Sequence, residues 1–99
     1  MSNPIKSPWP NTYEVVTPNG DREVVLYHTT IVIWPKGESR HLILCTGDHN
    51  TPLTRRRINQ VLKAWEIPLK VAAQDFRESC VRHVYQNEQS VWVMSPAGT

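Results

Sequence analysis

The sequence predicts a single α+β domain, with an antiparallel sheet of about four strands and one amphipathic helix over 52–66. Runs of β-branched and aromatic residues flank the turn pair Asn19-Gly20, which is typical of a β-hairpin. Thr51-Pro52 opens a stretch in which apolar residues recur at helical spacing. With 99 residues and 39% apolar side chains, the chain suits one small folded domain.

The two ends of the chain are expected to lie outside this domain. Three prolines in the first ten residues disfavour regular structure, so residues 1–11 are predicted to form an extended arm, loose or dependent on a partner, with Trp9 as an anchor. Residues 12–95 form the domain, and residues 96–99 are expected to be a frayed tail.

Four segments read as strands. Residues 12–17 and 22–34 flank the hairpin turn, 40–46 make a third strand, and 91–94 close the domain. Both alternating faces are apolar between 24 and 34, which predicts one central strand covered on each side. His28 on such a strand is expected to be a buried, hydrogen-bonded histidine.

The helix is the most regular pattern in the sequence. Thr51 can cap it and Pro52 suits its first turn. One face is apolar, formed by Thr54, Ile58, Val61, Leu62 and Trp65. The opposite side is polar, with Arg56, Asn59, Gln60 and Lys63, and Arg55 and Arg57 flank it.

Residues 68–86 have two interpretations. Apolar residues from Leu69 to Val84 fall on one helical face and Glu78 lies four before Arg82, which favours a second helix. The alternative is a terminal hairpin of 81–85 and 90–94, since both stretches are rich in β-branched and aromatic residues.

No stretch has the length and composition of a signal peptide or a membrane-spanning helix, so a soluble cytoplasmic protein with no membrane partner is expected. Cys45 and Cys80 would then remain reduced, most simply as structural thiols. The net charge of +2 permits nucleic-acid binding without requiring it.

The sequence lacks the common signatures of catalysis, including Gly-x-Ser-x-Gly, the phosphate-binding loop and His-Glu-x-x-His. The prediction is therefore a protein that is not an enzyme and has no cofactor. Cys45, His49, Cys80 and His83 are a weak candidate zinc set, because two Cys and two His can make a tetrahedral site. The alternative is that these side chains are simply buried or hydrogen-bonded.

Positive charge is concentrated in residues 51–70, which hold five cations and one anion, while the rest of the chain sums to −2. Arginine forks and interleaved amides suit phosphate, carboxylate or base edges. The predicted contact residues are Arg55, Arg56, Arg57, Asn59, Gln60 and Lys63. Trp34, an aromatic residue beside the turn at Pro35, is also predicted to contact the partner. The alternative is that Trp34 packs in the core. For the charged side, the alternative is a solvated helix face.

Four stretches together resemble small uncharacterised proteins encoded by bacteriophages: YHTTIV at 27–32, LILCTG at 42–47, TPLTRRRINQVL at 51–62, and a late Trp92-Val93. In those proteins a strand ends in Thr-Gly or Gly-Gly, a threonine cap opens a helix reading Arg-x-Asn or Arg-Ile-Asn, and a strand with a Trp closes the domain. The match spans about residues 23–67. The closing part departs from the pattern, because more residues precede the Trp here.

The resemblance implies a mobile-element origin. Phage proteins of this size often bind and block a host factor, and anti-CRISPR proteins are one class of them. The expected function is a non-enzymatic binding module that occupies a host nucleic-acid-handling complex through its basic helix face. One alternative is direct DNA or RNA binding, and a second is a small zinc-stabilised structural module.

Overall fold

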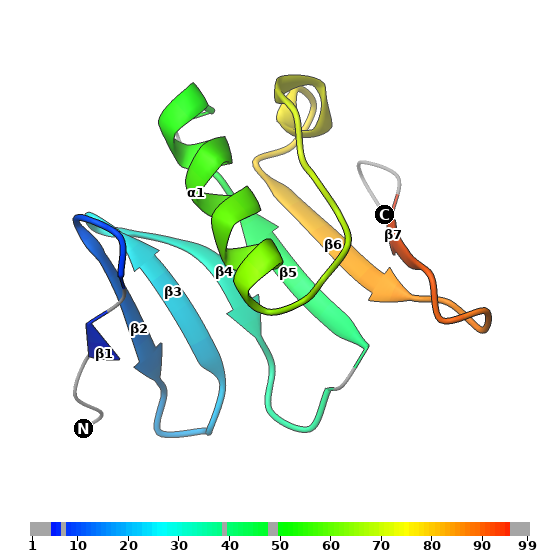
Figure 1. Ribbon diagram of the computed structural model, residues 1–99, viewed down its shortest axis with the longest axis horizontal. Helices are drawn as coiled ribbons and strands as arrows, with labels where there is room; N and C mark the ends of the chain where they lie inside the picture. The colour runs from blue at the N-terminus through cyan, green and yellow to red at the C-terminus, as the bar shows by residue number, and fades with distance from the viewer. Residues whose placement is uncertain (1–4, 7, 39, 48–49, 96–99) are drawn as a thin grey trace.

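The computed structural model describes residues 5–6, 8–38, 40–47 and 50–95, and it shows an antiparallel sheet with a helix across one face (Figure 1). The strands follow one another through the sheet in chain order. They are β1 (Ile5–Lys6), β2 (Thr12–Val16), β3 (Arg22–Leu26), β4 (Thr29–Trp34), β5 (His41–Cys45), β6 (Val81–Gln86) and β7 (Trp92–Met94). The α+β class is confirmed, but the sheet has seven strands and not about four.

The hairpin predicted around Asn19-Gly20 is confirmed as β2 and β3, with Val16 opposite Arg22. Its turn is closed by Thr17, whose backbone N–H donates to the Asp21 carbonyl at 2.9 Å and whose carbonyl accepts from the Gly20 N–H at 2.8 Å. Gly20 has φ +94°, a conformation that a side chain would strain.

The single central strand predicted over 24–34 is wrong, because the chain reverses at Tyr27 and His28. Leu26 pairs with Thr29, and β3 and β4 are therefore neighbours. Tyr27 has φ +56° and its N–H donates to the Asn11 carbonyl at 2.8 Å, which holds the turn against the chain before β2. The turn was hidden in the sequence because Tyr, Thr and Ile all have high strand propensity. His28 is exposed at this turn and is not a core residue.

The predicted helix is confirmed as α1 (Pro52–Ala64), which ends two residues earlier than expected. The Thr51 hydroxyl accepts from the Thr54 N–H at 3.3 Å and caps its first turn. The helix lies across β4 and β5 on one side of the sheet (Figure 1). Its apolar stripe joins the inward-facing strand residues in one core: Val24, Leu26, Ile31, Val32, Leu42, Leu44, Ile58, Val61, Leu62, Ile67, Val71, Phe76 and Val84.

The end of α1 reverses the chain direction. The Glu66 N–H donates to the Lys63 carbonyl at 3.1 Å and the Ile67 N–H donates to the Leu62 carbonyl at 2.8 Å, while Glu66 has φ +61°. These two bonds around a left-handed residue form a Schellman motif, and the buried side chains of Ile67 and Leu62 supply its usual apolar contact. The chain therefore returns beside the helix.

Replacing Glu66 with glycine is expected to raise the free energy of unfolding by about 1 kcal/mol, because a residue with a Cβ pays roughly that amount in the left-handed conformation. Urea unfolding measures the change. Glu88→Gly in an exposed position is the control, with no stabilisation expected. An unchanged or lower stability for Glu66→Gly would show that the Glu66 side chain contributes as much as the strain costs.

The second helix favoured over 68–86 is wrong. This stretch contains an extended return, a 3-10 turn η1 (Ala73–Phe76) and strand β6, which pairs with β7 with Tyr85 opposite Val93. The alternative terminal hairpin is confirmed. The physical reason is tertiary: β6 completes the hydrogen bonds of β5, whose Leu42 and Leu44 are fully buried at the centre of the domain.

Part of the predicted N-terminal arm pairs with the sheet. Ile5 is opposite Glu14 and Lys6 is opposite Tyr13, so β1 forms one edge. The Trp9 side chain is half-buried and packs against the core cluster, as an anchor would. Residues 1–4 of the arm and the predicted tail 96–99 lie outside the described residues.

Candidate binding groove

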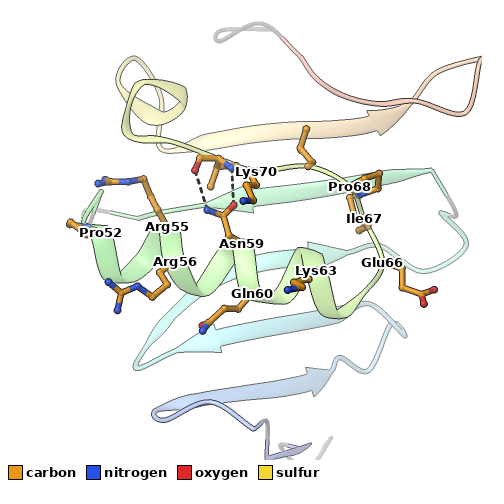
Figure 2. A pocket seen from close by; sticks show the side chains of 12 residues that line it. Pro52, Arg55, Arg56, Asn59, Gln60, Lys63, Glu66, Ile67, Pro68 and Lys70 are labelled. Carbon is orange, nitrogen blue, oxygen red and sulfur yellow. Dashed lines mark hydrogen bonds between the residues drawn. The ribbon is translucent and has the colours of Figure 1, made fainter.

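A groove of about 920 Å³ runs between the outer face of α1 and the returning segment 66–71 (Figure 2). Its long axis follows the helix, and one wall carries apolar side chains from the return. The lining residues are Pro52, Arg55, Arg56, Asn59, Gln60, Lys63, Glu66, Ile67, Pro68, Leu69, Lys70 and Val71. Five of the seven residues predicted to make contact with a partner are among them.

Asn59 ties the return to the helix. Its Nδ2 donates to the Val71 carbonyl at 3.2 Å, and its Oδ1 accepts from the Val71 N–H at 2.8 Å. The side-chain amide thus pairs with the backbone as a neighbouring strand would, and Figure 2 shows both bonds. The amide predicted to bind a partner is used inside the protein, where it builds the second wall of the groove.

Positive charge surrounds this groove. Arg56, Lys63 and Lys70 are exposed, and Arg55 is half-buried with its Nη1 donating to the carbonyl and side-chain oxygens of Asn50 at 2.8 and 2.6 Å. Among the described residues that line the groove, Glu66 is the one acidic residue, which leaves four cations against one anion. Such a concave cationic surface attracts anionic groups.

The three consecutive arginines have three different surroundings. Arg55 bonds the loop before the helix and Arg56 extends from the side of α1 away from the return (Figure 2). Arg57 is only 8% exposed and its Nη1 donates to Gln60 Oε1 at 2.9 Å. Arg57 is not among the groove residues, and it occupies the acceptor of Gln60.

Trp34 is not among the groove residues and lies in a cluster with Trp65, at the C-terminal end of α1. Its ring is 5.3 Å from that of Trp65, and the Arg22 guanidinium lies 4.6 Å from the Trp65 ring centroid and 5.9 Å from that of Trp34. The Nε1 of Trp34 donates to the Glu38 carbonyl. Arg22 is itself paired with Glu14 at 2.6 Å, so the cluster links β2, β3, β4 and the end of α1.

The structure describes three of the four candidate zinc ligands, and it does not bring these three together. The Cys45 sulfur accepts from the Gly47 N–H at 3.3 Å, Cys80 is exposed, and His83 Nδ1 lies 2.9 Å from His41 Nε2 in a hydrogen bond. Cys80 lies at a bend directly before β6, whereas His83 lies within this strand. His49 lies outside the described residues, and among those described no three His, Cys, Asp or Glu side chains are placed to hold a metal.

Sequence reasoning missed the second wall of the groove. This wall includes Ile67, Pro68, Leu69 and Lys70. The prediction gives Ile67 no role, places Pro68 and Leu69 at the start of a second helix, and uses Lys70 only as a charge. Pro68 was the available signal, because proline and the residue before it disfavour a continuing helix.

Comparison with protein-family models, with curated proteins and with solved structures finds no match to this chain. Within the residues the structure describes, no helix is long and apolar enough to cross a bilayer. The fold and groove define a small α+β protein that presents a positively charged groove along its helix.

Proposed function

We propose that this protein is a non-enzymatic binding module whose groove along α1 takes an acidic segment of a partner protein. The observation that carries the proposal is the combination of four cations with an apolar wall in one groove. Carboxylates of a bound segment would face Arg55, Arg56, Lys63 and Lys70. Its apolar side chains would lie against Pro68 and Leu69, as in interfaces with an apolar centre and a polar rim.

Two features favour a protein segment over nucleic acid. Among the described residues, no aromatic side chain lines the groove, whereas sites for single strands use aromatic rings as stacking platforms. A helix with its side chains is about 10–12 Å across and just fits the major groove of DNA, which is about 12 Å wide. Here the returning segment lies beside α1, so the two together are too wide to enter that groove.

The resemblance of the sequence to bacteriophage-encoded proteins extends the proposal to a host cytoplasmic complex that handles nucleic acid. CRISPR effectors are one class of such complexes. Protein interfaces commonly pair a positive patch with a negative one, so the groove would occupy an acidic surface of such a complex.

The test is fluorescence polarisation with two labelled probes, a peptide of alternating acidic and leucine residues and a DNA duplex. The peptide is expected to bind the wild-type protein, and the double variant Arg56→Glu/Lys63→Glu is expected to weaken that binding by more than about tenfold. Arg40→Glu/Arg77→Glu is the matched control, since it makes the same change of charge at exposed residues outside the groove.

Salt titration separates the two classes of partner. Duplex binding through four cations would fall with ionic strength at a log–log slope of about −3 to −4, whereas a peptide held partly by apolar contacts would show a shallower slope. The proposal is overturned if the duplex binds more tightly than the peptide, or if the control variant loses as much affinity as the groove variant.

A further inference from the structure

The face of the sheet opposite α1 is not covered by any described element, and it is mostly apolar. Residues directly opposite one another in antiparallel strands point to the same face, so the register defines this surface. From β2 to β7 its members are Tyr13, Val15, Glu23, Val25, Thr30, Ile33, His41, Ile43, Cys45, Val81, His83, Tyr85 and Val93. We refer to these residues as the open face. Tyr13, Val81 and Tyr85 are exposed, and the others are half-buried.

A central row crosses the open face from β2 to β6. Val15 is opposite Glu23, Glu23 is opposite Ile33, Ile33 is opposite Ile43, and Ile43 is opposite His83. Apart from His83, Glu23 is the one acidic or basic side chain of the row. Glu23 is half-buried between Val15 and Ile33, and its carboxylate has no ion pair or hydrogen bond within the described part of the chain.

The imidazole at the other end of the row is oriented by a second one. His41 Nε2 and His83 Nδ1 are 2.9 Å apart, the ring centroids are 5.1 Å apart, and the ring planes lie within 9°. Most of the centroid separation is the nitrogen-to-nitrogen distance, so the rings meet edge to edge in one N–H···N bond. The hydrogen bond to His41 uses Nδ1 of His83, so Nε2 of His83 can bond a group on another molecule that docks on the open face.

We propose that the open face binds a second copy of this chain, face to face, about a two-fold axis that runs parallel to the strands between β4 and β5. That axis exchanges β4 with β5 and β3 with β6. Ile33 then lies over Ile43 of the second copy, and Glu23 lies over His83 of the second copy. The unpaired carboxylate thereby meets an imidazole that can donate from Nε2, and it does so twice in a two-fold interface.

The size of the open face also fits a dimer. The six strands β2 to β7, spaced by about 4.8 Å and about five residues long, at about 3.4 Å each, span roughly 500 Å² per copy. Two copies would bury about 1,000 Å², the size at which specific interfaces begin. The groove lies on the other side of the sheet, so dimerisation leaves both grooves accessible, and the proposal does not depend on the function of the groove.

Sedimentation equilibrium of the purified protein over a range of concentrations tests the proposal. The wild-type protein is expected to be a dimer. Ile43→Arg should dissociate it, while Leu53→Arg, a matched change at an exposed apolar residue of α1, should not. Glu23→Lys and His83→Glu should each weaken dimerisation by roughly a hundredfold. The first places two hydrogen-bond donors against one another, and the second places two carboxylates against one another.

The double variant Glu23→Lys/His83→Glu is expected to restore the dimer. Within one chain these residues are three strands apart, about 14 Å, so a rescue requires contact between copies. Circular dichroism spectra confirm that each variant is folded. A monomeric wild-type protein, a dimer that survives Ile43→Arg, or single variants that dissociate without rescue in the double variant would each overturn the proposal.

Discussion

Replacing Trp34 with alanine is expected to lower the free energy of unfolding by about 3 kcal/mol, the lower end of the range for removing a large aromatic side chain. The indole packs against Trp65 and beneath the Arg22 guanidinium, and its Nε1 bonds the Glu38 carbonyl. Alanine would remove the ring contact, one cation–π partner and the hydrogen bond together. In a domain of this size such a loss corresponds to a fall in Tm of about 15 °C.

Urea unfolding followed by circular dichroism measures this change. Trp34→Phe is the control that keeps most of the ring packing and loses only the Nε1 bond, with an expected cost of about 1 kcal/mol. Arg56→Ala, at an exposed groove residue, should change stability by less than about 0.5 kcal/mol. If Trp34→Ala is as stable as the wild-type protein, Trp34 is available for a partner as the sequence suggested, and the cluster contributes little to the fold.

The parts of the fold that the sequence predicts are those with strong local chemistry. A turn that needs a positive φ attracts Asn19-Gly20, and a helix start attracts Thr51-Pro52, so the first hairpin and α1 appear where they were expected. In the hairpin the Gly20 N–H bonds the Thr17 carbonyl, and at the helix start the Thr54 N–H bonds the Thr51 hydroxyl. Each element is thus closed by residues only three positions apart.

The failures occur where the deciding partner is distant in the sequence. Tyr27 adopts a positive φ because its N–H finds the carbonyl of Asn11, and nothing at positions 26–28 announces that turn. Val81–Gln86 is a strand because β5 needs a neighbour, and the paired residues lie 36 to 44 positions apart in the sequence, from Cys45 with Val81 to His41 with Tyr85. Local periodicity carries no information about either partner.

The same distinction applies to the candidate site. Helical spacing correctly places Arg56, Asn59, Gln60 and Lys63 on the side of α1 away from the sheet. Spacing does not show that Asn59 bonds Val71 or that Gln60 accepts from Arg57, because both depend on how the chain returns after Glu66. The exposed cations at Arg56 and Lys63 are what remains of the predicted ridge, and Lys70 joins them from the opposite wall.

Arg57 shows that position in a charged run does not establish a contact role. The side chain is 8% exposed, its Nε has no hydrogen-bond partner, and no carboxylate in the described part of the chain lies within ion-pairing distance. Among the described residues, the one hydrogen-bond partner of its side chain is the neutral Gln60. A guanidinium that loses its hydration without an anionic partner is costly, because the low-dielectric interior does not replace the water it has lost.

Arg57→Met is therefore expected to raise the free energy of unfolding by about 2 kcal/mol, because methionine fills the space of the aliphatic stem and removes the buried charge. Gln60 is half-buried, so water can replace the donor it loses. Chemical denaturation measures the change, and Arg56→Met on the exposed side of the helix is the control, with an effect below about 0.5 kcal/mol. A loss of stability in Arg57→Met would show that the bond to Gln60 outweighs the desolvation of the guanidinium, and that the buried cation stabilises the helix on the sheet.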